Sequence, residues 1–227
     1  MKHKIEFAPD FAMLTIELDS GESIVAESGA MAAMSAGVSL KTEARGGVLA
    51  SLKRKVLGGE SIFQNIFTAG SNGQHVIFSP PAMGDIIRYD LQGRELLLQS
   101  TAYLVSEQGV ELDTKWAGVK GFFGGHGLFL LKVRGSGSVY FSTYGAVHPV
   151  EVNGSYVVDT GHIVAFEPTL QYRVKSVGGF KSLFLSGEGL VCEFSGSGKV
   201  WVQTRKPQRT AEFLHPFRPV KAKKGSD

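Results

Sequence analysis

The sequence predicts an all-β fold built from three internal repeats, with at most one or two short helices. Three observations support this fold class: segments that match one another within the chain, short runs of alternating apolar and polar residues, and 29 glycines spread between those runs. Alternation over a few residues indicates strands, and glycine is the usual residue of hairpin turns. We therefore expect a pseudo-threefold body of the β-sandwich or double-stranded β-helix type.

Matched segments at the start of each copy define the repeats. Residues 21–42 and 93–114 align without a gap, and residues 153–174 keep the same spacing from Thr160 onward, which matches Ser28. A second set of glycine-centred segments closes each copy, at residues 58–63, 124–129 and 186–191. Such internal periods indicate repeated units, here at about 10–90, 91–150 and 151–205 within a single domain of residues 1–205.

Size and composition are those of a globular domain. The chain has 227 residues, of which 43% are hydrophobic and 20% charged, and its formal net charge is +3. A single unit of this size could hardly bury its apolar strands alone, so we expect the copies to share one hydrophobic core. Cys192 is the only cysteine and lies in an apolar run. This placement predicts a buried, inert thiol.

The predicted compartment is the cytoplasm. Residues 1–7 lack the apolar stretch of a signal peptide, and no apolar run approaches the roughly 18 residues of a membrane-spanning helix. A single, reduced cysteine fits the same compartment. Any association with a membrane is therefore expected to be peripheral.

Two regions depart from the strand pattern. Within residues 44–57, four apolar side chains fall on one face at helical spacing, which predicts a short helix. Residues 206–227 form a basic, proline-containing tail. We expect the last third of this tail to be disordered.

No combination of residues forms a recognisable catalytic or metal-binding motif. The Gly-Ser-Gly turns are not phosphate-binding loops, because Lys199 is followed by Val200 where a Ser or Thr would have to reach magnesium. None of the six histidines is spaced two or four residues from another, which leaves open only a metal site assembled from scattered His and Glu residues. We predict no catalytic residue, no metal and no cofactor, and a protein that is not an enzyme.

The most informative segments precede the glycine blocks, where every copy mixes glycine, Lys or Arg, and large apolar residues. In a threefold body these equivalent segments would project from one end as a basic, apolar face, suited to an anionic membrane or a protein partner. Two other interpretations stay open: the aromatic residues fill the core while the lysines reach water, or self-association buries the face. The candidate residues are Lys53, Arg54, Lys55, Lys115, Trp116, Lys120, Phe122, Phe123, Phe180, Lys181 and Phe184.

A set of local motifs points to a known family. They lie at residues 57–61 (Leu-Gly-Gly-Glu-Ser), 67–69 (Phe-Thr-Ala), 84–86 (Gly-Asp-Ile), 113–116 (Asp-Thr-Lys-Trp), 121–127 (Gly-Phe-Phe-Gly-Gly-His-Gly) and 159–162 (Asp-Thr-Gly-His). They resemble the "altered inheritance of mitochondria 24" family. The resemblance implies a threefold duplication and a fold like that of the tryptophan RNA-binding attenuation protein. It also links the eukaryotic relatives to organisation of the mitochondrial inner membrane, and it carries over no catalytic residue.

These observations favour a non-enzymatic scaffold or membrane-peripheral interaction protein that acts through the basic, apolar face. The alternative is a module that binds RNA or a small ligand, which rests on likeness of fold alone. Nucleic acid is the less favoured partner because the basic residues are not dense enough for a typical binding patch. We also expect a homo-oligomer, either a trimer or a multiple of it.

Overall fold

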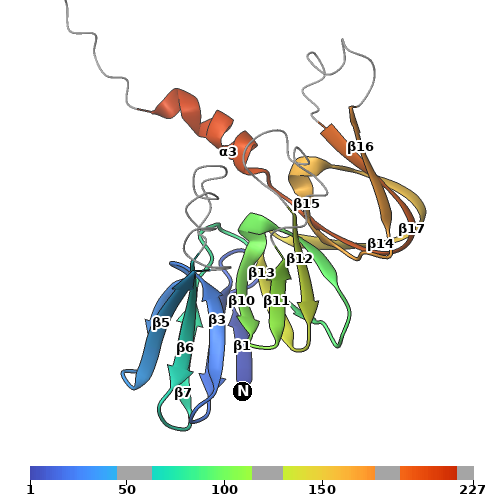
Figure 1. Cartoon of the computed structure of the whole chain (residues 1–227). Coiled ribbons are helices and arrows are strands. Elements are labelled where there is room, and N and C mark those ends of the chain that lie inside the picture. Colours follow the sequence, from blue (N-terminus) through green and yellow to red (C-terminus); the bar gives the residue numbers. More distant parts are fainter. Residues whose placement is uncertain (45–62, 114–129, 177–189, 219–227) are drawn as a thin grey trace, which may run out of the picture.

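The computed structural model describes residues 1–44, 63–113, 130–176 and 190–218, and over these residues the protein is built mainly of antiparallel strands (Figure 1). Three lobes follow one another along the chain. The strands β1 to β7 form the first lobe, β8 to β13 the middle lobe, and β14 to β17 the last lobe. The all-β fold class is therefore confirmed. The helix expected at residues 44–57 falls on positions outside the described residues, apart from Ala44, which ends a strand.

The strands in the described part of the chain form three sheets. The first has the order β1 (Lys2–Glu6), β2 (Met13–Leu18), β7 (Gln74–Phe78), β4 (Met31–Met34). The second has the order β5 (Val38–Ala44), β6 (Phe63–Ala69), β3 (Ser23–Glu27), β10 (Tyr103–Glu107), β13 (Ser138–Ser142), β8 (Ile86–Asp90). The third has the order β11 (Val110–Asp113), β12 (Leu130–Gly135), β9 (Leu96–Gln99), β15 (Ile163–Phe166), β17 (Leu190–Gln203), β14 (Val147–Asp159), with β16 (Gln171–Ser176) also paired to β17.

Short helical elements join or follow the strands. The single turns η1 (Ser100–Ala102) and η2 (Thr160–His162) lead into β10 and β15, and α3 (Pro207–Leu214) with η3 (His215–Phe217) follows the last strand. The helix α3 therefore occupies part of the segment predicted only as a basic tail. Residues 219–227, which include the final third of that tail, lie outside the described residues.

Alternating hydrophobicity places the strands on the core as expected. In β2, Leu14, Ile16 and Leu18 are fully buried, whereas the residues between them are half-buried. Successive side chains of a strand point to opposite faces, so this pattern puts one face of the sheet on the core. By contrast, every residue of β9 and β15 is buried, because both strands lie in the interior of the third sheet.

The same pairing order occurs three times along the chain. It appears as β5-β6-β3, β11-β12-β9 and β16-β17-β14, and a second order appears as β4-β7-β2, β10-β13-β8 and β15-β17-β14. In the last copy, β14 and β17 each run on through both orders as one long strand. Repetition of the order is what copies of one unit would produce, although the threefold duplication itself stays a prediction.

A β-bulge recurs at matching positions. The register skips one residue in β4, β10 and β15, at Ala32, Leu104 and Val164. A bulge places one unpaired residue in a strand and bends it. Each of these residues lies four positions after Ser28, Ser100 or Thr160, which the sequence aligns with one another. Positions that are matched in the sequence therefore have the same backbone irregularity in the structure.

The buried side chains form three clusters, which corrects our expectation of one shared core. The first cluster takes Leu104 and Val105 from the middle lobe, and the second takes Ala165 and Trp201 from the last. The first cluster takes its side chains from strands of the first and second sheets, the second from strands of the second and third sheets, and the third from strands of the third sheet. The lobes are thus joined by strand pairing and shared packing at each junction, without a common centre.

Candidate interaction surface

The helix α3 is explained by its local sequence. Pro207 occupies its first turn, where the missing N–H costs nothing and the fixed φ suits a helix. Ala211 and Glu212 are strong helix formers in its middle. The turn η3 follows directly, and Pro216 within it cannot continue an α-helix. These residues explain why a short helix begins and ends here. We did not predict this helix from the sequence.

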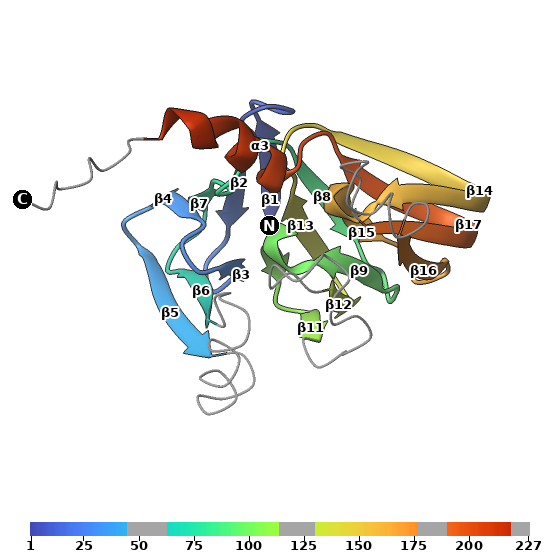
Figure 2. The ribbon, with the colours of Figure 1, turned by 90° about the horizontal axis from the view of Figure 1, so that it is seen from above.

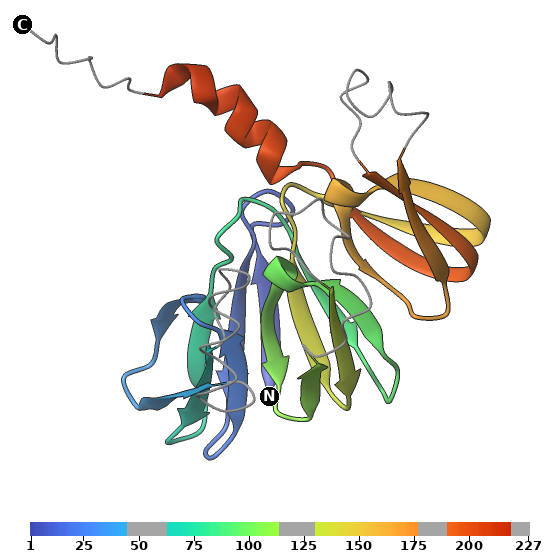
Figure 3. The ribbon, with the colours of Figure 1, turned by 45° about the horizontal axis from the view of Figure 1, so that its top comes forward.

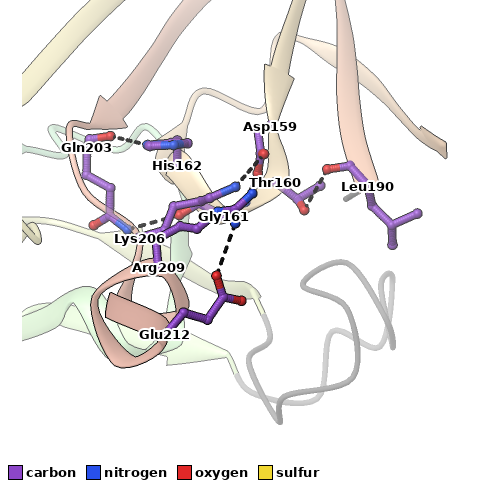
Figure 4. A network of polar contacts seen from close by, with 9 residues as sticks. All are labelled: Asp159, Thr160, Gly161, His162, Leu190, Gln203, Lys206, Arg209 and Glu212. Atoms are coloured by element: carbon purple, nitrogen blue, oxygen red, sulfur yellow. Dashed lines mark hydrogen bonds and ion pairs between the residues drawn. The ribbon is translucent and has the colours of Figure 1, made fainter. Parts of the chain in front are cut away.

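An ion pair fixes the base of α3 to the third lobe (Figure 4). The Lys206 ammonium donates to Asp159 Oδ2 at 2.6 Å, and the two side chains are only 14% and 18% exposed. Asp159 Oδ1 accepts the N–H of Gly161 at 2.8 Å, which caps η2. A Cβ on Gly161 would come within 2.6 Å of Lys206 Cδ. Glycine at this position thus lets the lysine side chain lie against the turn.

Gln203 and His162 complete this connection, which we call the clamp (Asp159, Gly161, His162, Gln203 and Lys206; Figure 4). Gln203 Nε2 donates to the carbonyl of Gly161 at 3.1 Å. His162 Nδ1 lies 2.7 Å from the carbonyl oxygen of Gln203. A carbonyl can only accept, so His162 carries its proton on Nδ1. The motif at residues 159–162, noted above for its family resemblance, therefore holds the chain where α3 begins.

A second set of contacts holds the first turn of the helix to the middle lobe. The Tyr144 hydroxyl donates to Thr210 Oγ1 at 2.8 Å, and the Tyr144 N–H donates to Gln203 Oε1 at 2.9 Å. The N–H of Arg205 donates to the Tyr144 carbonyl at 3.2 Å. The start of α3 is thus attached to two lobes through hydrogen bonds.

Beyond this attachment, the apolar side chains of the helix face solvent. Phe213 is 70% exposed, Leu214 55% and Phe217 75%, and α3 has no buried residue. The Phe213 and Phe217 rings contact each other, with centroids 5.9 Å apart. Figure 3 shows the helix leaving the body of the molecule from its base. An isolated helix this short is marginal in water, so the contacts at its base contribute to its stability.

Loops at the same end of the molecule carry further exposed apolar side chains. Phe7 is 68% exposed, Phe11 66% and Met83 57%. Hydrogen bonds join these loops to one another, from Ala12 N–H to the Gly84 carbonyl and from Gly145 N–H to the Met83 carbonyl. Tyr144, the neighbour of Gly145, continues the connection to α3. Phe7, Phe11 and Met83 are thus exposed on loops that are linked through this connection to the segment where α3 begins.

The basic, apolar face predicted from the sequence cannot be placed. All eleven of its residues, from Lys53 to Phe184, lie outside the described residues. Sequence reasoning instead missed α3, whose prolines we interpreted as signs of a tail. The signal was the spacing of Thr210, Phe213, Leu214 and Phe217 after a helix-starting proline.

The described residues contain few candidates for chemistry. Among them, no three His, Cys, Asp or Glu side chains come together as metal ligands. Cys192 is fully buried, as predicted, and burial raises the pKa of its thiol to about 12. No helix in the described ranges is long and apolar enough to cross a bilayer.

The comparisons with known proteins show the family. The sequence profile described as "Mitochondrial biogenesis AIM24" matches residues 3–205. The chain belongs to the AIM24 family. The resemblance noted from the local motifs is therefore confirmed, whereas likeness to the tryptophan RNA-binding attenuation protein stays a prediction. The helix α3 lies beyond the residues that the AIM24 profile matches.

Two streptococcal proteins are similar over nearly the whole chain. An uncharacterised protein of Streptococcus pyogenes serotype M6 is 24% identical over 97% of this chain and 92% of its own length. A crystal structure of a protein from Streptococcus pyogenes superposes with a TM-score of 0.77 at 22% identity, covering 96% of this chain and 99% of that one. At 22% identity this structural likeness shows the fold alone.

Proposed function

We propose that this protein is a non-enzymatic, membrane-peripheral interaction protein that binds anionic lipid surfaces through α3. The observation that carries the proposal is the exposure of Phe213 and Leu214 on α3 and of Phe217 on the turn η3 that follows it, with the base of α3 held by the clamp. Aromatic and aliphatic side chains favour the boundary between headgroups and acyl chains. A fixed base presents them in one orientation.

The charge around α3 supports an anionic partner. Residues 205–227 contain seven Lys or Arg and two acidic residues, a formal charge of +5, whereas the whole chain has +3. The rest of the chain is therefore slightly acidic, and the positive charge is concentrated in the same stretch of sequence as these apolar residues. Each basic residue near an anionic membrane contributes about 1 kcal/mol of attraction.

Neither contribution suffices alone. Burying one phenylalanine in an apolar medium contributes about 1.5–3 kcal/mol, which by itself gives weak, reversible binding. Stable attachment to a membrane takes two signals, such as apolar insertion together with a basic segment. The segment from Arg205 onward combines both within one stretch of chain.

Vesicle co-sedimentation tests the proposal. Wild type is expected to sediment with vesicles that contain phosphatidylserine, and the double variant Phe213→Ala/Phe217→Ala is expected to bind at least about tenfold more weakly. Alanine keeps the helix propensity. The matched control is Leu40→Ala, which removes a 46% exposed side chain from β5 and should leave binding unchanged.

Lipid composition and salt separate this mechanism from others. Binding should weaken on vesicles of phosphatidylcholine alone and in high salt, because the electrostatic part is screened. Equal sedimentation of wild type and the double variant would contradict the role of α3. A wild type that shifts single-stranded RNA and ignores anionic vesicles would contradict the membrane proposal as a whole.

A further inference from the structure

Among the described residues, two of the unpaired sheet edges lie at positions that are paired between lobes elsewhere in the chain. The strand β4 pairs only with β7, and the second half of β14, from Ser155 to Asp159, pairs only with β17. Each presents a row of backbone N–H and C=O groups that another strand can pair with. The two edges belong to the first and the last lobe.

The two junctions inside the chain show what such edges pair with. The strand β10 of the middle lobe pairs with β3 of the first, through Val105 and Ala26. The strand β15 of the last lobe pairs with β9 of the middle, through Ala165 and Leu98. Counted from the aligned Ser28, Ser100 and Thr160, both pairings join position +5 of one lobe to position −2 of the preceding lobe. The register is identical.

The same register can be applied to the two open edges, β4 and the second half of β14. It defines a third junction, which one chain cannot form between its own first and last lobes. It joins Ala33 to Val158 and Met34 to Val157. Figure 2 shows the first lobe with β4 and the last lobe with β14 at opposite ends of the molecule, with the middle lobe between them. We propose that β4 of one chain pairs antiparallel with the Ser155–Asp159 segment of a second copy, so that chains assemble head to tail.

Burial supports this third junction. Every residue of β15 and all but the last of β10 are buried by the internal junctions. In β4, by contrast, Met31 is half-buried and the other three residues are exposed. On the opposite edge, Tyr156 is 44% and Val157 49% exposed, whereas the aligned Leu96 and Leu97 are buried. The exposed apolar residues of both edges therefore lie where the register of the internal junctions would place a contact between two chains.

The charge pattern of the edge strands points the same way. Natural proteins protect free edges with charged side chains. The edge strands β5, β11 and β16 carry the ion pairs Lys41–Glu43, Arg134–Glu111 and Lys175–Glu193, shared with their neighbours in two cases. The strand β4 reads Met-Ala-Ala-Met, and residues 155–158 read Ser-Tyr-Val-Val. Across these two edges the only charged residue is Asp159, at the end of the second edge, and its carboxylate is paired with Lys206.

A head-to-tail contact uses two different surfaces, so it generates a closed ring or an open filament. The number of chains in a closed ring would be set by the angle through which each lobe is rotated relative to the next. This assembly does not rest on the proposed membrane function, because neither edge contains a residue of α3. A ring would nevertheless bring several α3 helices together and multiply a weak attachment.

Cysteine cross-linking tests the register. The double variant Met34→Cys/Val157→Cys, treated with a short bis-maleimide, is expected to give a ladder of covalent multimers in denaturing gels. The native Cys192 is fully buried and should not react. Each single variant should remain a single chain, because in a head-to-tail contact a residue never meets its own copy. Cross-links in the single variants, or a cross-link confined within one chain, would overturn the proposal.

Solution mass provides an independent test. Wild type should sediment as a multiple of the 24.4 kDa chain, and Val157→Lys should sediment as one chain. Leu40→Lys, which adds the same charge to the unused edge of β5, should keep the wild-type mass. Mixing Met34→Glu with Val157→Lys should restore the assembly, because the two charges then face each other. A single-chain wild type at tens of micromolar, or an assembly that survives Val157→Lys, would overturn the proposal.

Discussion

The environment of Cys192 changes the pKa of its thiol and thereby links this residue to the stability of the fold. It lies in the third apolar cluster with Phe194 and Val174 nearby, and burial raises the pKa of its thiol from 9.0 to about 12. Burial disfavours the thiolate because the charge loses its hydration. The sequence predicted this environment, since an apolar run with alternating burial leaves little alternative for a lone cysteine.

Stability should therefore fall in alkaline solution through this residue. Below pH 9 the thiol is protonated in both states, and between pH 9 and 12 it ionises only in the unfolded chain. The free energy of unfolding then falls by up to about 1.4 kcal/mol per pH unit. Urea unfolding from pH 8 to 11 should show a steeper decline for wild type than for Cys192→Ala, while tyrosines affect both alike. Parallel curves would contradict the buried thiol.

The helix α3 owes its position to contacts from other elements. Its own sequence determines that a helix forms, but Asp159 and Tyr144, distant in sequence, determine where it begins and how it is oriented. A segment with few buried contacts belongs to the least stable part of a structure. The clamp is therefore the place where a single substitution should release the helix.

Replacing Asp159 by Asn should loosen α3. The change leaves Lys206 as a largely buried charge without its partner, which costs about 1–3 kcal/mol. We expect faster amide exchange over residues 205–218 and a lower urea midpoint. Glu17→Gln breaks the ion pair of Glu17 with Lys2, whose side chains are 43% and 80% exposed, and should leave both readouts unchanged. Unaltered exchange in Asp159→Asn would show that the ion pair does not hold the helix.

The molecule as a whole is a row of lobes joined by one kind of junction. Residues at aligned positions are consequently buried where two lobes meet and exposed at the outer edge of a terminal lobe. Val105 is fully buried where the first and middle lobes meet, whereas the aligned Ala33 is exposed at the outer edge. The same strand position is thus part of the core within the chain and part of a surface at its end.

An aspartate at these two positions should separate folding from assembly. Val105→Asp buries an unpaired charge, so we expect loss of more than about 3 kcal/mol and little folded protein. Ala33→Asp should fold with a circular dichroism spectrum like that of wild type but sediment as a single chain. If both variants unfold, or if both fold and assemble, the two positions are not equivalent and the junction rule fails.

The sequence by itself determined the all-β class, the spacing of the matched segments and the burial of Cys192. These properties depend on local alternation and on turn residues, which a single segment carries within itself. The family, too, could be identified from short motifs. The β-bulge was not predicted from the sequence, although the structure places it at the same distance from the aligned Ser28, Ser100 and Thr160.

Only the tertiary structure decided which strands pair across lobes, that three clusters replace one core, and that α3 exposes its apolar face. Each of these depends on contacts between residues far apart in the chain, and hydrophobic spacing does not specify the partner that covers an apolar side chain. Val157 and Leu97 occupy aligned positions in similar apolar sequence, yet one is exposed and the other buried. The reason is that β9 has β15 beside it as well as β12, whereas the equivalent half of β14 pairs with β17 alone among the described residues.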